Sequence, residues 1–130
     1  FGELGCATCH VPPRFESERY VDRGVGGDDT GREQVSGDAR DRFAFRVPSL
    51  RNAQSTDPYF HDGSVAKLED AILHELRLSP GFDPARADDD VAVLTAFVGR
   101  GLVDTSREPT RPDKVPSGLE VPVDGFRIPR

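Results

Sequence analysis

Both cysteines of this 130-residue chain lie in one five-residue motif, Cys6-Ala7-Thr8-Cys9-His10. A scaffold of several disulfides is therefore excluded, and any covalent cross-link that stabilises the fold must use this one site. The chain also contains 13 glycines and 11 prolines, and only 35% of its residues are hydrophobic. This composition predicts one domain in which many loops surround a small core.

The charge and the apolar runs of the chain exclude two classes of partner. The formal net charge is −6, which excludes a broad basic face for nucleic acid. The longest apolar run, near Val91–Val98, is much shorter than the ~18 residues that span a bilayer, so no transmembrane segment is expected. The sequence opens without a visible secretory signal, which we interpret as a leader already removed or as a fragment of a longer chain.

The spacing Cys-x-x-Cys-His is the attachment pattern of c-type haem. In this pattern, two thiols form thioethers with the two vinyl groups of the haem, and the adjacent histidine is the proximal iron ligand. We therefore predict one covalent haem c on Cys6 and Cys9, with His10 as the proximal ligand. A zinc site would need a fourth ligand from distant His61, from His74 or from a carboxylate. A redox dithiol would need a βαβ context, and no such pattern precedes the motif.

The segment after the motif is predicted to be irregular. Val11–Phe43 contains repeated glycine and proline and has no sustained hydrophobic period. A loop of this length is uncommon unless something besides its own core orders it, and a bound cofactor would do so. Phe43–Leu50 is predicted to be a short extended piece, because Pro48 disfavours helical geometry at Val47. Little sheet is expected elsewhere.

Two segments have apolar residues at helical spacing. The first helix is predicted over Ser64–Leu76 with Ser64 as its N-cap, and the second over Asp88–Gly99 with three acids at the positive end of its dipole. The predicted buried faces comprise Val65, Leu68, Ile72 and Leu76 in the first helix, and Val91, Leu94, Val98 and Leu102 in the second.

The side of the haem opposite His10 either has a second iron ligand or is left open. The chain contains no methionine, so the commonest sixth ligand of electron-transfer cytochromes cannot come from it. Helical geometry directs Glu75 inward and His74 outward, and an inward carboxylate needs iron or an arginine as its partner. The candidates for this distal side are Glu75, His61, His74, Tyr59 and Lys67, with an empty site or a ligand from another chain also open.

Residues 104–130 differ in character from the predicted haem domain over residues 1–103. Five prolines forbid regular structure there, namely Pro109, Pro112, Pro116, Pro122 and Pro129. We interpret this Pro-rich tail as a linker, or as an extended arm laid over a neighbour. Its apolar residues are Leu119, Val121, Val123, Phe126 and Ile128.

Several motifs occur together in a particular order. They are Cys6–His10, Thr30-Gly31-Arg32, Phe45-Arg46-Val47-Pro48-Ser49-Leu50-Arg51-Asn52, Pro58-Tyr59-Phe60-His61-Asp62-Gly63, Leu68-Glu69-Asp70-Ala71 and Asp88–Val98. Over about Phe1 to Val103, this set strongly resembles the closing, C-terminal haem domain of the bacterial dihaem cytochrome c peroxidases and the related MauG proteins. The resemblance implies a mainly α, loop-rich, cytochrome c-like domain. It also implies a second haem domain in tandem with this one. Because only five residues stand before Cys6, we expect that the helix leading into the haem motif and the partner haem domain are missing from this chain.

The same resemblance implies roles for particular residues. His61 would lie near the haem and between the two haems of the family, and is the catalytic candidate. The carbonyl groups of Thr56 and Pro58 resemble the contributions of the family to a calcium site between its two domains. Glu75 stands at the position of the distal methionine of the peroxidases or the tyrosine of MauG, and as a ligand it would favour ferric iron. The expected haem contacts also include Arg46, Pro48, Arg51 and Tyr59.

Arg46 and Arg51 are forked donors suited to haem propionates, with surface ion pairing as the alternative for both. The function implied by the resemblance is electron relay from a donor protein to a peroxide-reducing haem in a second domain or chain, located in the periplasm. The alternatives are a non-catalytic electron-transfer or assembly subunit, and MauG-like oxidation of a protein substrate. Peroxide turnover is not expected of this chain alone.

Overall fold

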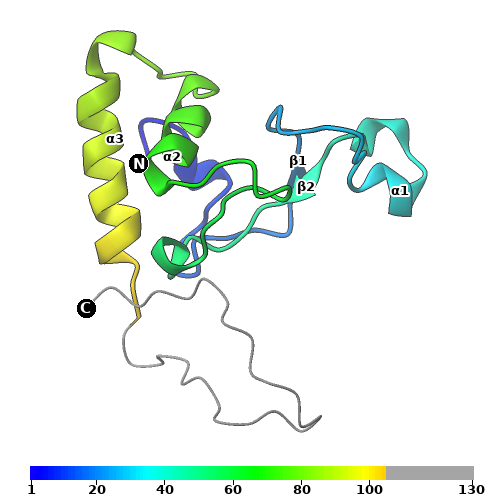
Figure 1. Cartoon of the computed structure of the whole chain (residues 1–130), viewed down its shortest axis with the longest axis horizontal. Helices are drawn as coiled ribbons and strands as arrows, with labels where there is room; N and C mark the ends of the chain where they lie inside the picture. The colour runs from blue at the N-terminus through cyan, green and yellow to red at the C-terminus, as the bar shows by residue number, and fades with distance from the viewer. Residues whose placement is uncertain (105–130) are drawn as a thin grey trace, which may run out of the picture.

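The computed structural model describes residues 1–104, so the Pro-rich tail from residue 105 onward, with the apolar residues expected to form an arm, lies outside the described residues. In the described part, three helices and a two-stranded antiparallel sheet are joined by long loops (Figure 1). None of these helices is long and apolar enough to cross a membrane. The elements are β1 (Tyr20–Val21), α1 (Glu33–Ser36), β2 (Phe45–Arg46), α2 (Leu68–Arg77) and α3 (Ala87–Ala96).

Helix α2 begins at Leu68, so the prediction that Ser64 caps this helix is wrong. The backbone before it is extended: the N–H of Tyr59 donates to the carbonyl oxygen of Val65 at 2.7 Å, and the two residues form an isolated β-bridge. The carboxylate of Asp62 accepts the N–H of Ser64 at 3.0 Å within the intervening turn. This bridge removes Val65 from the helix, although the spacing of Val65 matches the apolar face.

Helix α3 closely follows its prediction. It runs from Ala87 to Ala96, carries three aspartates in its first turn and continues into a π-helical turn at Phe97–Gly101. Of the predicted face, Leu94, Val98 and Leu102 are buried, whereas Val91 is half-buried. Helix α2 packs beside α3 (Figure 1) and buries Leu68 and Leu76.

The N-terminal segment is attached to this helical pair by aromatic contacts. The rings of Phe1, Phe15 and Phe97 form a mutual cluster with centroids 5.3–6.0 Å apart. One cluster of buried residues comprises Ala53, Leu68 and Val98, with Leu50, Tyr59, Ile72 and Phe97 packed at its edge. The aromatic cluster therefore holds the cysteine motif next to the helices.

The sheet lies where the sequence predicted only one extended piece. Strand β2 falls within the predicted extended segment, and it pairs with β1 in the register Tyr20 with Arg46 and Val21 with Phe45. The interpretation of Val11–Phe43 as loop throughout is corrected, because this range also contains β1 and α1. These elements have only two and four residues, too few to produce a periodic signal.

Gly31 allows two segments of this region to approach closely. Its φ is +62°, and a Cβ at this position would lie 2.7 Å from the carbonyl oxygen of Ala44 and 3.0 Å from the ring of Phe45. Only glycine fits both the left-handed backbone and the contact. The Gly-Arg step in the sequence therefore has a steric cause.

Candidate haem-attachment site

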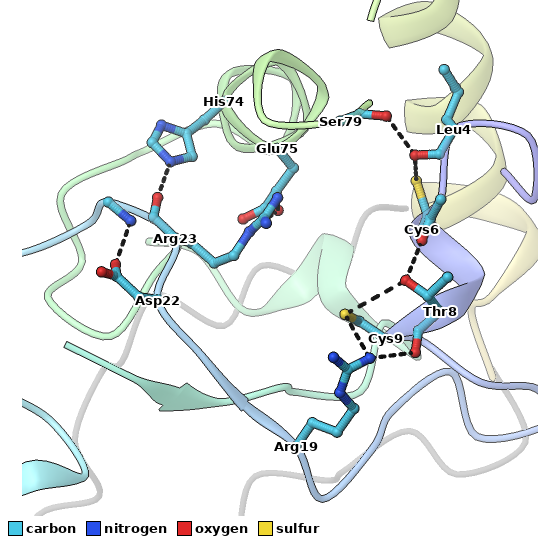
Figure 2. Close-up of polar contacts among 12 residues, drawn as sticks. Leu4, Cys6, Thr8, Cys9, Arg19, Asp22, Arg23, His74, Glu75 and Ser79 are labelled. Carbon is cyan, nitrogen blue, oxygen red and sulfur yellow. Dashed lines mark hydrogen bonds and ion pairs between the residues drawn. The ribbon is translucent and has the colours of Figure 1, made fainter. Parts of the chain in front are cut away.

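The two thiols lie at the ends of one turn. Residues Cys6–Thr8 form a 3₁₀ turn, and both cysteines are free and half-buried. Arg19 donates from Nη1 to the carbonyl oxygen of Thr8 at 3.1 Å, and the same nitrogen lies 3.8 Å from Sγ of Cys9 (Figure 2). Burial raises the pKa of the Cys6 thiol, so that thiol is predominantly protonated near neutral pH. The turn thus presents two reduced sulfur atoms for cross-linking.

His10 is oriented by a backbone carbonyl group. Its Nδ1 lies 3.0 Å from the carbonyl oxygen of Phe15, and a carbonyl oxygen can only accept, so Nδ1 carries the proton. In the neutral ring, Nε2 is then the basic nitrogen. Histidine ligands of metals generally donate their other N–H group in this way, which fixes the tautomer and the ring orientation. The geometry of His10 therefore fits an iron ligand acting through Nε2.

Glu75 extends from α2 into the region between α2 and the Cys6–Thr8 turn (Figure 2). Its Oε2 accepts from Nε of Arg23 at 2.7 Å and lies 2.5 Å from Nη2 of the same arginine. The Glu75 side chain is 41% exposed and the Arg23 side chain is 36% exposed, so the pair lies at the edge of the fold. Both charges act on the Cys6 thiol, where Glu75 raises the pKa and Arg23 lowers it. An arginine partner for Glu75 was one of the two sequence-based alternatives.

The prediction that His74 points outward is wrong. Its ring is half-buried, Nε2 lies 2.7 Å from the carbonyl oxygen of Arg23, and the ring packs edge-to-face on Phe60 with centroids 5.0 Å apart. The loop carrying Arg23 and the turn carrying Phe60 cover this side of α2. The spacing of residues along a helix does not show which other segments of the chain cover it. Figure 2 shows His74 beyond Arg23, on the side away from the cysteines.

Two further predicted haem contacts lie beside the loop that follows His10. Arg46 lies 3.4 Å from Glu16 through Nη2, and Arg51 donates from Nε to the carbonyl oxygen of Pro13 at 3.2 Å. Pro48, between them in sequence, is exposed. The structure therefore brings both arginines to the segment that orients His10, where they already have partners of their own.

Tyr59 and His61 have different surroundings although they are two residues apart. The Tyr59 hydroxyl group donates to the carbonyl oxygen of Ala53 at 3.1 Å, and burial raises the pKa of Tyr59. His61 is exposed, and its ring stacks on Phe45 with centroids 3.5 Å apart. Lys67, also a distal-side candidate, is exposed at the start of α2. Of these three, only Tyr59 is fixed by the core.

The turn that contains Thr56 and Pro58 is exposed. The Thr56 hydroxyl group donates to the carbonyl oxygen of Ala53 at 3.1 Å. Within residues 1–104, no group of three or more histidine, cysteine, aspartate or glutamate side chains could hold a metal ion. Calcium at this turn would therefore depend on carbonyl groups and on a neighbouring domain.

The chain can be compared with proteins of known identity. No protein-family model matches the chain. A cytochrome c551 peroxidase of Nitrosomonas europaea is 36% identical over 107 residues, which cover 76% of this chain and 32% of that protein. The methylamine utilization protein MauG of Methylorubrum extorquens is 37% identical over 79 residues, which cover 58% of this chain and 22% of that protein. This chain is a homologue of the bacterial cytochrome c peroxidase and MauG family, and it fits the C-terminal part of that family.

A solved structure agrees with this relationship. The crystal structure of a MauG-like protein associated with microbial copper homeostasis matches with a TM-score of 0.63 and 26% identity, over 82% of this chain and 45% of its own. The relationship to the peroxidase and MauG family implies haem c as a cofactor. The chain spans a third or less of the curated relatives it matches.

Sequence reasoning missed three groups at the site of this peroxidase-family chain. They are Arg19, Arg23 and the carbonyl oxygen of Phe15. All three lie in the segment without hydrophobic period, and they reach the site through turns and the short sheet. No local pattern identifies them.

Proposed function

We propose that this chain is a c-type haem electron-transfer domain of cytochrome c-like fold, within a dihaem cytochrome c peroxidase-like oxidoreductase. It would relay electrons from a donor protein to a peroxide-reducing haem in a second domain or chain. The observation that carries the proposal is the hydrogen bond between Nδ1 of His10 and the carbonyl oxygen of Phe15, directly after a complete attachment motif. That bond prepares Nε2 for a metal, which neither a thiol redox site nor a disulfide requires.

The residues of this chain would hold the cofactor at several points. Cys6 and Cys9 would attach it as thioethers, and His10 would bind the iron through Nε2. The haem, when bound, supplies a one-electron carrier whose potential depends on its ligands and surroundings. The chain fixes the ring of His10 through the carbonyl oxygen of Phe15, and the pair of Arg23 and Glu75 would place charges near the haem.

Further roles are proposed for the remaining candidate residues. Glu75 would provide the distal side of the haem from α2. Arg46 and Arg51 would bind the propionates after exchanging their present partners, since guanidinium groups bind carboxylates in forked geometry. Pro48 and Tyr59 would contact the haem face, with the Tyr59 hydroxyl group anchored to the core.

His61 would lie on the path between the two haems. Its ring is exposed and stacked on Phe45, so it is available to a neighbouring domain. Thr56 and Pro58 would border a calcium ion at the contact with that domain, through carbonyl groups of their exposed turn. Both roles require a partner domain, and the haem proposal does not depend on them.

We propose a periplasmic or otherwise extracytoplasmic location, because haem c is attached outside the bacterial cytoplasm. A non-catalytic electron-transfer or assembly subunit would use the same haem, as would MauG-like oxidation of a protein substrate. A peroxide assay on the full-length protein separates these functions. Peroxide reduction with a reduced donor protein supports the leading proposal, whereas electron transfer without peroxide turnover supports the subunit.

The cofactor proposal is tested by producing the full-length protein in a host that attaches haem c. Denaturing mass spectrometry of the peptide containing Cys6 and Cys9 should show one added haem. Replacement of both cysteines by alanine should remove that mass from this peptide. An unmodified peptide, or zinc bound in place of haem, would contradict the proposal.

A further inference from the structure

The ion pair between Arg23 and Glu75 is one-sided. Both arginine contacts, from Nε at 2.7 Å and from Nη2 at 2.5 Å, fall on Oε2 of the carboxylate. Within residues 1–104, no hydrogen bond reaches Oε1. A carboxylate has about four acceptor positions, so half of this group keeps its full capacity to accept a proton donor or to bind a metal.

Arg23 is fixed in place by its backbone as well as by its side chain. Its carbonyl oxygen lies 2.7 Å from Nε2 of His74, the residue preceding Glu75 on α2. The carboxylate of Asp22 accepts the N–H of Gly24 at 2.8 Å and closes a turn around the arginine. Two consecutive side chains of α2 thus hold one arginine at two points. The pair is therefore more restrained than an isolated surface ion pair, which generally contributes little.

The pair also lies at the proposed haem site. Figure 2 shows the Glu75 carboxylate and the Arg23 guanidinium group between α2 and the Cys6–Thr8 turn, with His74 on the far side. Both charges act on the thiol of Cys6, which would form one of the two thioether bonds. The free oxygen Oε1 therefore belongs to a carboxylate that is held next to the attachment motif.

We propose that Arg23 is a positioning residue for the distal side of the haem: it holds Oε2 of Glu75, so that Oε1 is presented to the iron. This inference rests on the proposed function, because it requires a haem on Cys6 and Cys9. From the sequence, iron and an arginine were alternative partners for Glu75. The contact of Arg23 with Oε2 alone makes the two partners compatible. Carboxylate ligands of metals are commonly supported by an outer hydrogen bond, and a permanently charged arginine offsets the cost of placing the carboxylate there.

The proposal is tested in the haem-loaded chain with Arg23→Gln, Glu75→Gln and the double variant. Imidazole can bind the ferric iron on the distal side only if it displaces a carboxylate ligand there. The affinity for imidazole therefore reports how strongly the carboxylate binds. We expect Glu75→Gln and Arg23→Gln each to tighten imidazole binding, the latter by about 10- to 100-fold, the usual effect of removing an outer partner. In the Glu75→Gln background, Arg23→Gln should add no further change, because Arg23 acts only through Glu75.

Two further variants complete the design. Arg86→Gln removes the same charge from the pair of Arg86 with Asp90 on α3, at 3.2 Å, and should leave imidazole affinity and the ferric spectrum unchanged. Arg23→Lys keeps the charge without the fork and should give an intermediate affinity. This variant also keeps the proposal testable if the glutamine variant does not fold.

Each other outcome overturns the proposal. If Glu75→Gln changes the spectrum and imidazole affinity while both Arg23 variants change neither, then Arg23 positions nothing, although the haem function stands. If Glu75→Gln changes neither quantity, Glu75 is not at the iron. An equal effect of Arg86→Gln would show a general charge effect. A chain without covalent haem by denaturing mass spectrometry overturns the proposed function, and this inference with it.

Discussion

The carbonyl oxygen of Phe15 lies 3.0 Å from Nδ1 of His10, across a turn in which the N–H of Phe15 also donates to the carbonyl oxygen of Val11 at 2.8 Å. The backbone that follows the attachment motif thus returns to orient the imidazole ring. The ring of Phe15 is anchored in the aromatic cluster with Phe1 and Phe97, so the carbonyl group has a fixed position. The ring of His10, the proposed proximal ligand, is therefore preorganised by the chain itself.

Replacing His10 should change the haem spectrum without releasing the haem. In His10→Ala, both thiols remain, so denaturing mass spectrometry should still show one haem, while the absorption spectrum should lose the features of an imidazole ligand. Val11→Ala, which truncates the exposed neighbouring side chain, is the matched control and should leave the spectrum unchanged. An unaltered spectrum in His10→Ala would assign the proximal ligand to another residue.

Alkylation of Cys6 in the haem-free chain should be slow near neutral pH and accelerate as pH rises. Burial raises the pKa of this thiol, so at a given pH a smaller fraction is the reactive thiolate. Glu75→Gln removes a charge that raises this pKa further, so the rate should increase at fixed pH. Mass spectrometry of the Cys9→Ala variant measures the rate at this one thiol. A faster rate at lower pH would contradict the assigned shift.

Gly31→Ala should destabilise the haem-loaded chain more than Gly37→Ala. Both glycines have positive φ, +62° and +69°, so each alanine introduces similar backbone strain. Only the Cβ at Gly31 would clash, 2.7 Å from the carbonyl oxygen of Ala44, whereas nothing lies within 4 Å of a Cβ at Gly37. Overpacking typically costs about 1–3 kcal/mol, and denaturant unfolding should show a difference of that order. Equal losses of stability in the two variants would mean that the segments at Gly31 and Ala44 can move apart without cost.

Leu76→Ala should be among the most destabilising substitutions in α2. Leu76 is 2% exposed, whereas Leu78, two residues later, is 47% exposed. Truncation of a buried leucine costs about 2–5 kcal/mol in free energy of unfolding, while a surface substitution stays within about 0.5 kcal/mol. Thermal unfolding of the two alanine variants, monitored by circular dichroism, tests this contrast. A similar loss in Leu78→Ala would indicate that a partner covers that surface.

Calcium removal should alter the full-length protein at the contact between its domains. If the Thr56 and Pro58 carbonyl groups border calcium, chelation should change the haem spectra, the oligomeric state or the activity, and added calcium should restore them. Magnesium serves as the control ion, because it requires a tighter octahedral site. Chelation without effect on all three properties would remove calcium from the proposal.

Features that depend on the local spacing of residues could be predicted from the amino-acid sequence. Two thiols and an imidazole within five residues predict covalent haem attachment, whatever the surrounding fold. The apolar period of α3 predicted that Leu94, Val98 and Leu102 would be buried, and the acids at its start lie in its first turn. Local spacing was sufficient here because a helix places residues three or four apart on one face.

Contacts outside the helices could not be predicted from the spacing of residues. The bridge between Tyr59 and Val65 delayed the start of α2, although the apolar spacing extended back through Val65. The partner of Glu75 is Arg23, 52 residues earlier, in a segment without periodic signal. His74 is covered by the same segment. Such contacts depend on loop closure and on the packing of non-local elements, which no spacing along the chain encodes.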